Sequence, residues 1–197
     1  MQYHYIAGQT PLDEEEKRAL IPSIVTREDL DAWEQENILE ARSWLMRKST
    51  LARQDVMSEA FLLELHKRMF GRVWKWAGSY RRSEKNIGVA YYEIPTHLRE
   101  LMDDAGFWRQ YKSYPPRDMA VMLHHRLVKI HLFANGNGRH ARMCADALLA
   151  QAGEAPLSWG GGDLSKPEEL RRRYIDALQA ADRGDYDLKR YLRHQTQ

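Results

Sequence analysis

Apolar residues recur every three or four positions along most of this 197-residue chain, which is the period of an amphipathic helix. The first such segment follows Thr26-Arg27-Glu28-Asp29, whose Thr-x-x-acid spacing is typical of a helix N-cap. The pattern predicts a helix over about 26–48, with an apolar stripe made of Leu30, Trp33, Asn37, Ile38, Ala41 and Leu45. On this interpretation Glu34, Glu40 and Lys48 lie on the solvent side.

Five more helices are predicted, bounded by glycine and proline. They cover about 55–70, 95 or 96 to 111, 115–130, 138–152 and 167–184, and a short last helix follows Asp185. Between the helix over 55–70 and the next one lies VWKWAGSYRRSEKNIGVAYYEIP, residues 73–95, which mixes glycines with β-branched and aromatic residues. This mixture predicts a loop and a short hairpin. The predicted fold class is therefore all-α, with one small β-hairpin.

Composition and charge narrow the class of protein. The length suits one compact domain. The 30 basic and 28 acidic residues are mixed along the chain, with neither a basic stripe nor an aromatic platform, which argues against direct nucleic-acid binding. A single cysteine, Cys144, leaves no intramolecular disulfide and suits a reducing compartment. With no apolar run of the roughly 20 residues that cross a bilayer, we expect a cytoplasmic protein without a membrane segment; a homo-oligomer stays open.

The segment HLFANGNGRHAR, residues 131–142, carries the strongest chemical signal. Gly136 and Gly138 permit a sharp turn whose backbone N–H groups point into one concavity, and such a concavity binds anions. A helix that starts near Gly138 adds its positive end at the same place. Arg139 and Arg142 share one face of that helix, where each guanidinium can fork onto phosphate oxygens. This combination suits a polyphosphate.

His131 precedes the glycines and is a candidate general base, since an imidazole takes up a proton near neutral pH. Phe133 is interpreted as the apolar anchor that fixes the loop. A base, an anion site and two arginines are the parts that nucleotidyl or phosphoryl transfer needs. His124 and His125, on the preceding helix, are interpreted as partly buried, hydrogen-bonded residues and not as metal ligands.

These residues resemble the signature of the Fic family, His-Pro-Phe-x-acid-Gly-Asn-Gly-Arg-x-x-Arg. The matching positions are His131, Phe133, Gly136, Asn137, Gly138, Arg139 and Arg142. VWKWAGSYR and AYYEIP are similar to the upstream segment and the hairpin flap of these domains. The resemblance spans about 58–192, which leaves 1–57 as an N-terminal helical region and 193–197 as a tail. The N-terminal half is also similar to a Fic subgroup called mobile mystery protein B, found on mobile elements of bacteria.

The resemblance implies a Fic-like helical bundle that transfers AMP from ATP to a Ser, Thr or Tyr hydroxyl of a target protein. His131 would deprotonate the hydroxyl, and pyrophosphate would leave. The backbone of 136–138 would hold the phosphates, with Asn137 and Arg139 in contact with them and Arg142 at the γ-phosphate. A flap at Tyr91 and Tyr92 would hold the target in extended form, as in strand addition.

Two positions depart from the signature. Leu132 replaces the proline, a change of little expected effect because Phe133 remains as anchor. Asn135 replaces the acidic residue that ligates magnesium in the family, and its neutral oxygen is a weaker ligand for a hard cation. The substitution predicts low activity, use of manganese in place of magnesium, or another phosphate-containing donor.

Many Fic proteins carry an inhibitory helix with Ser or Thr-x-x-x-Glu-Gly or Asn, whose glutamate pairs with the second arginine of the signature. The candidate here lies within 26–48 at residues 32–37, where Ala32 replaces the hydroxyl residue and Glu36-Asn37 supplies the pair. Glu36 lies about 60° from Trp33 around the helix, so we expect it to face an internal arginine. The alternative is a solvated charge.

Two other functions stay open. The same fold could transfer another phosphate-containing group, such as phosphate or a different nucleotide. Kinases of the Doc type replace the second glycine of the signature, and Gly138 is present here, which favours nucleotidyl transfer. The chain could also be a non-catalytic partner of a small DNA-binding regulator, but the intact His131 and both arginines argue against that role.

Overall fold

A computed structural model of the chain describes residues 11–24, 26–157, 159 and 176–186. The helices are α1 (Glu14–Arg18), α2 (Arg27–Leu45), α3 (Lys48–Leu51), α4 (Glu59–Phe70), α5 (Ile94–Tyr111), α6 (Pro116–Ile130) and α7 (Asn137–Gln151), with one short 3-10 helix, η1 (Tyr91–Glu93). The helix expected over 167–184 is described only for residues 176–182. The short helix expected after Asp185 falls almost wholly outside the described residues.

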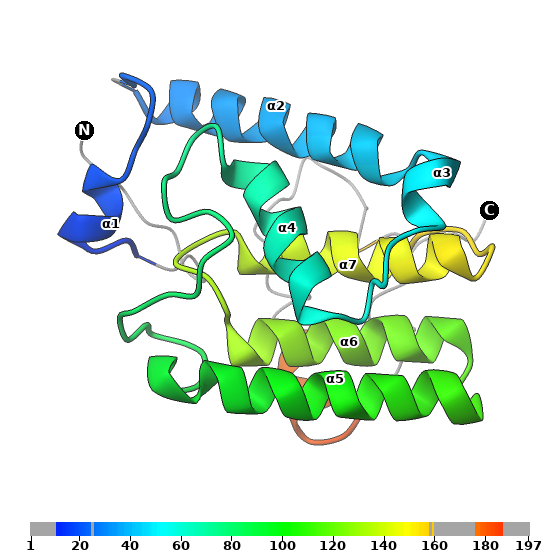
Figure 1. The fold of residues 1–197 in the computed structure, drawn as a ribbon. Coiled ribbons are helices and arrows are strands. Elements are labelled where there is room, and N and C mark those ends of the chain that lie inside the picture. Colours follow the sequence, from blue (N-terminus) through cyan, green and yellow to red (C-terminus); the bar gives the residue numbers. More distant parts are fainter. Residues whose placement is uncertain (1–10, 25, 158, 160–175, 187–197) are drawn as a thin grey trace.

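The helices form three layers (Figure 1). α2 lies across one side, α4 and α7 occupy the middle, and α6 and α5 lie side by side on the other side. Buried residues join the layers into one core that runs from Leu12 and Leu30 to Leu149 and Ala177. The N-terminal helices are therefore part of the same packed body as the rest.

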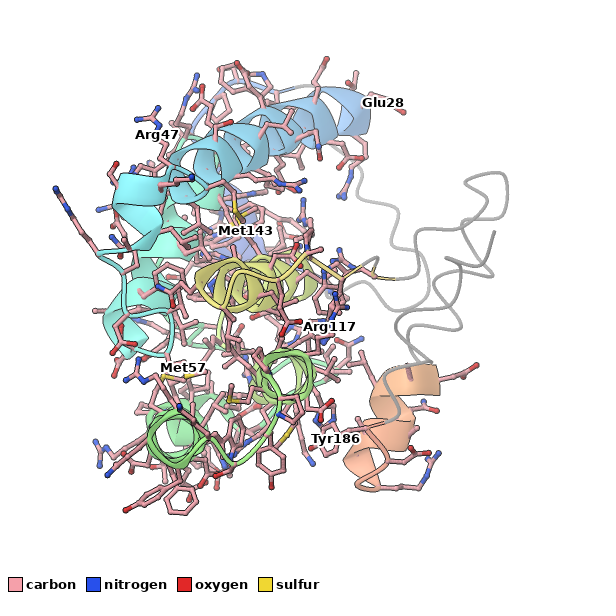
Figure 2. All side chains as sticks on the ribbon, turned by 90° about the vertical axis from the view of Figure 1, so that its right-hand side faces the viewer. Glu28, Arg47, Met57, Arg117, Met143 and Tyr186 are labelled. Carbon is pink, nitrogen blue, oxygen red and sulfur yellow. The ribbon has the colours of Figure 1, made fainter. Side chains whose placement is uncertain are left out.

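Viewed nearly along the helix axes, residues 176–182 lie beside α6 (Figure 2). His125 of α6 contacts both neighbouring side chains: its Nε2 lies 3.1 Å from Asp182 Oδ1, and its Nδ1 lies 3.3 Å from the Tyr186 hydroxyl. His124 is buried and packs its ring 4.4 Å from the ring of Trp159. Both histidines are buried and make side-chain contacts, as the sequence predicted.

α2 begins at the predicted cap, where the Thr26 hydroxyl accepts a hydrogen bond from Asp29 N–H. The predicted buried face of this helix is confirmed at Leu30, Asn37, Ala41 and Leu45, but it is wrong at Trp33. Glu34 is 4% exposed, whereas Trp33, expected in the core, is 39% exposed. The buried positions follow steps of three and four residues, and they are Leu30, Glu34, Asn37, Ala41 and Leu45. The Glu34 carboxylate is tolerated in the interior because both of its oxygens accept hydrogen bonds, from Trp74 and Arg139.

The predicted β-hairpin flap is absent from the described part of the chain, which contains no strand and only an isolated bridge between Leu20 and Trp74. Residues 79–90 form a loop, and Tyr91 and Tyr92 lie in the 3-10 turn that leads into α5. The backbone of this loop bonds to another segment instead of to itself: Arg81 N–H donates to Leu132 O and Val89 N–H to Ile130 O. A hairpin would need those same groups for pairing across the loop.

The other predicted helices are present, with shifted ends. α4 starts at Glu59 and not near 55, because the Ser58 hydroxyl caps it by accepting from Phe61 N–H. α5 and α6 each have a proline in their first turn, as expected. Among the described helices, none has the length and apolarity that a bilayer crossing requires.

Candidate active site

The turn between α6 and α7 places the residues of the HLFANGNGRHAR segment. His131 ends α6 in the left-handed conformation, with φ 60°. Leu132, Phe133 and Ala134 are then buried, and Gly136 turns the chain into α7 with φ 79°. A Cβ on Gly136 would lie 2.5 Å from the Phe70 ring, so both the backbone conformation and the available space require glycine here.

His66 of α4 supports this turn from beneath. Its ring stacks on Phe133 at 3.6 Å between centroids. Its Nδ1 accepts a hydrogen bond from Gly78 N–H, so the ring proton lies on Nε2, which donates to Asn135 O at 3.1 Å. Burial lowers the pKa of His66 well below 6.5, which keeps this tautomer neutral. His66 was not among the predicted site residues. The available signal was a polar residue next to Leu65 and Leu62 on the buried face of α4.

The side chain of Asn137, a residue that the resemblance places at the phosphates, lies inside the turn. It is 5% exposed and bonds back to Phe133. Asn137 Oδ1 accepts from Phe133 N–H at 2.9 Å, and Nδ2 donates to Phe133 O at 2.7 Å. Both polar ends of the amide therefore hold the turn closed, and only the backbone N–H of Asn137 is available for a ligand.

The start of α7 has the character of an anion site. The first hydrogen bond of the helix runs from His140 N–H to Gly136 O, so the N–H groups of residues 137–139 precede the ladder. Among the described residues, no side chain caps this end. Three N–H groups and the positive end of the helix dipole thus converge where the sequence placed phosphates.

Arg139 extends from this end of α7 toward α2. Its Nη1 donates to Glu34 Oε2 at 2.6 Å, while Glu34 Oε1 accepts from Trp74 Nε1 at 2.7 Å. Arg139 also stacks over the Phe70 ring, at 4.8 Å, and its Nη2 lies 3.5 Å from Asn135 Oδ1. Arg139 is 35% exposed on its side chain and Glu34 only 5%, so the pair lies at the boundary between the core and solvent.

The two glutamates of α2 near the expected inhibitory position have different surroundings. Glu36 is exposed and does not face an internal arginine. Glu34, two positions earlier and on the opposite side of α2, contacts an arginine of the signature. That arginine is Arg139, the first of the two, and not Arg142, which is half-buried. Burial raises the pKa of Asp146 and lowers that of His124, and the charge of Arg142 opposes the first shift and adds to the second.

His131 is 4% exposed and lies at the mouth of the same turn. The pKa of His131 is lowered to about 4, mainly by burial and also by the positive charges of Arg81 and Lys85, against the opposing effect of the Val128 carbonyl. At neutral pH the imidazole is therefore unprotonated, which is the form that a general base requires.

Tyr91 and Tyr92 lie beyond the loop that borders His131. They are 40% and 70% exposed, and their rings meet edge to face at 5.5 Å. The backbone contact between Val89 and Ile130 joins this loop to the residue before His131. The two tyrosines thus belong to a segment fixed to the turn, although not as a strand.

The residues around Asn135 do not fit a firmly held magnesium ion. Asn135 Oδ1 is neutral and already accepts from Gly136 N–H at 2.5 Å. Within the described residues, no group of three histidine, cysteine or acidic side chains could hold a metal. Magnesium in nucleotide sites is usually held by one or two carboxylates besides the phosphates, and the turn offers none.

Residues 56–149 match the family model described as Fic/DOC family. The chain is 32% identical over 151 residues to "Protein adenylyltransferase Fic" from Aedes aegypti, an alignment that takes in 75% of this chain and 29% of that protein. The chain thus spans less than a third of the length of this relative.

Solved structures share the fold. Fic-1 from C. elegans is 25% identical, with a TM-score of 0.61 over 87% of this chain and 49% of that one. BepC from Bartonella tribocorum, solved with bound AMPPNP, is 16% identical, with a TM-score of 0.66 over 90% of this chain and 95% of that one. These matches concern the Fic/DOC family as a whole and not the mobile mystery protein B subgroup. Residues 56–149 of this chain form a Fic/DOC family domain.

Proposed function

We propose that this protein is an adenylyltransferase that moves AMP from ATP to a hydroxyl side chain of a target protein. The observation that carries the proposal is a buried, neutral His131 beside the uncapped start of α7, the helix that carries Arg139 and Arg142. The names of the insect relatives, each called a protein adenylyltransferase, support the same reaction.

The proposed reaction uses this geometry in one displacement. The N–H groups of residues 137–139 hold the phosphates of ATP, and Arg139 and Arg142 neutralise their charge. The target hydroxyl gives its proton to His131 while its oxygen bonds to the α-phosphorus. The bond from that phosphorus to the oxygen that leads to the β-phosphate breaks, and pyrophosphate leaves. The protein contributes position and charge more than covalent chemistry, as is usual for phosphorus transfer.

We further propose that α2 restrains the reaction through Glu34. The Glu34 carboxylate accepts a hydrogen bond from Arg139 Nη1, a donor that the phosphates of ATP would otherwise use. A triphosphate that reaches Arg139 must displace a buried carboxylate, which would then have to be hydrated or moved away. The pairing of Glu34 with Trp74 holds the carboxylate in place from its other oxygen and so opposes that displacement.

The proposed function is tested with ATP labelled at its α-phosphate. The labelled nucleotide is incubated with the purified chain, alone and with a cell lysate that supplies targets. The proposal expects label on protein with the native chain and at least a hundredfold less with His131→Ala, because general-base catalysis is worth roughly 10²–10⁴-fold. Equal labelling by His131→Ala would remove His131 from the reaction. Label only from γ-labelled ATP would make the protein a kinase.

A further inference from the structure

Arg81 has an unusual environment for an arginine. Its side chain is 0% exposed, and its guanidinium points at three main-chain carbonyls. Nε donates to His131 O at 2.7 Å, Nη1 donates to Ser83 O at 2.9 Å, and Nη2 donates to Val89 O. The carboxylate of Glu84 lies 4.0 Å away and is itself 61% exposed. This charge is therefore held in the interior mainly by peptide dipoles.

Burying this charge costs free energy, because the guanidinium loses its hydration without a close ion pair in return. A planar guanidinium can donate in several fixed directions at once, which no other side chain does. The three carbonyls come from the two sides of the loop 82–90 and from His131. Arg81 thus joins the loop that leads to Tyr91 and Tyr92 with the proposed general base.

The backbone around Arg81 makes the same connection. Arg81 N–H donates to Leu132 O at 3.0 Å and Val89 N–H donates to Ile130 O at 3.4 Å, so the loop bonds to the residues on both sides of His131. His131 has the left-handed φ of 60°, which is unfavourable for a residue with a side chain. The Arg81 guanidinium bonds to the carbonyl of this strained residue and favours that conformation.

Gly88 allows the loop to approach this closely. Its φ is 106°, and a Cβ there would lie 2.6 Å from His131 Cβ and 2.8 Å from Arg81 Nη2. Any side chain at this position would therefore push directly on the histidine. The loop, the arginine and the histidine fit together only with glycine at 88.

We propose that Arg81 is a positioning residue for His131, fixing its backbone and tying it to the loop that presents the target hydroxyl. This inference rests on the proposed function, since it assigns Arg81 to the same reaction. The charge of Arg81 has a second effect, because it lowers the pKa of His131 together with burial and Lys85. Glu84 and Glu16 moderate the charge of Arg81, and the Val128 carbonyl on α6 opposes its effect on His131.

Two substitutions separate position from charge. Arg81→Lys keeps the charge but cannot donate to three carbonyls, whereas Arg81→Met also removes the charge. The neighbouring Arg82 is exposed, so Arg82→Met is a matched control. The readouts are the pKa of His131, measured by NMR titration of its ring, and kcat and KM for ATP in AMP transfer. The NMR titration needs no activity, so it judges Arg81 even if the proposed reaction fails.

The proposal expects Arg81→Lys to leave the His131 pKa near its native value and to lower kcat by about 10- to 100-fold, with KM for ATP nearly unchanged, because misplacement of a reacting group by about 1 Å has an effect of that size. Arg81→Met should raise the His131 pKa, and Arg82→Met should change neither quantity. An unchanged kcat in Arg81→Lys, or an unchanged His131 pKa in Arg81→Met, would overturn the proposal.

A second pair of variants applies if Arg81→Met does not fold. Gly88→Ala places a methyl group against His131, whereas Gly106→Ala meets nothing within 4 Å of its Cβ and serves as the control. Gly88→Ala should shift the NMR signals of His131 and lower kcat, and Gly106→Ala should do neither. Native His131 signals in Gly88→Ala would show that the loop does not position the histidine.

Discussion

Glu34 and Glu36 lie two positions apart in α2, about 200° around the helix from each other, and their surroundings differ accordingly. Glu34 is buried between Trp74 and Arg139, whereas Glu36 is exposed. A comparable contrast exists at the turn of residues 131–136, where Gly136 is enclosed by the Phe70 ring and Asn135 is partly open. At this scale the properties of the site depend on single contacts that one substitution can remove.

Gly136→Ala should destabilise the protein by about 2–4 kcal/mol, because a methyl group would meet the Phe70 ring at 2.5 Å in a left-handed residue. Gly153→Ala is the control, since Gly153 has a similar φ of 75° but nothing within 4 Å of its Cβ. That variant should lose only the backbone contribution of about 1 kcal/mol. Urea denaturation measures both values, and equal losses would show that the Phe70 contact is unimportant.

Asn135→Asp should raise the affinity of the ATP-bound protein for Mg²⁺ by about tenfold, because a charged oxygen replaces a neutral one as a possible ligand. The measurement is the Mg²⁺ concentration at half-maximal AMP transfer. Asn86→Asp adds the same charge at an exposed position and should leave that concentration unchanged. No difference between the two variants would argue that position 135 takes no part in metal use.

At the scale of elements, the helices could be predicted because their signals are local: a 3.6-residue apolar period, a Thr26 cap, and proline or glycine near the ends. The loop of residues 79–90 could not, because it bonds to residues 130–132, about 50 positions or fewer along the chain: Arg81 N–H donates to Leu132 O, Arg81 Nε to His131 O and Val89 N–H to Ile130 O. Composition and alternation cannot report such pairing. Local sequence favoured a hairpin, but the loop backbone forms its hydrogen bonds with residues 130 and 132 instead.

The residues of the candidate site likewise differ in whether their partners are near or distant in the sequence. His131 and Gly136 belong to one short segment and could be found from sequence. Glu34 is 105 positions from Arg139, and His66 is 69 positions from Asn135. A glutamate on an amphipathic helix looks solvated until its distant arginine is known. Glu36 was the candidate because residues 32–37 resemble the inhibitory pattern of the family.

The ion pair between Glu34 of α2 and Arg139 of α7 leads to a prediction about ATP binding. Glu34→Gln should raise affinity for a non-hydrolysable ATP analogue by about tenfold, because Arg139 loses the carboxylate that competes with phosphate, a charged hydrogen bond worth about 1.5–3 kcal/mol. Isothermal titration calorimetry gives the affinity. Glu36→Gln is the matched control, with no expected change. An equal gain in both variants, or none in Glu34→Gln, would contradict a restraining role for Glu34.

At the scale of the whole molecule, the core joins the N-terminal helices to the Fic/DOC domain, and it also encloses several histidines. Burial lowers the pKa of His66, His124, His125, His131 and His140. The unfolded chain takes up these protons near pH 6.5, whereas the folded protein resists them, down to about pH 4 for His131 and His140. Protons therefore favour the unfolded chain between these values.

The free energy of unfolding should consequently be constant above about pH 7 and fall as the pH drops from 6.5 toward 4. His140 alone accounts for about 3 kcal/mol of this loss, given its pKa of about 4 when folded. Differential scanning calorimetry across this range measures the trend. His140→Gln should flatten it, while a change at His97, whose side chain is 41% exposed, serves as the control. A stability that rises on acidification would contradict the assignment of buried neutral histidines.

We propose that His131 acts as the base in an AMP transfer that α2 restrains through Glu34. The most direct test is mass spectrometry of Glu34→Gln, and of proteins incubated with it, after exposure to ATP and Mg²⁺. We expect an added AMP group on a hydroxyl side chain, more abundant than with the native chain and lost in the double variant Glu34→Gln/His131→Ala. An added phosphate in place of AMP, or AMP that persists in the double variant, would contradict it.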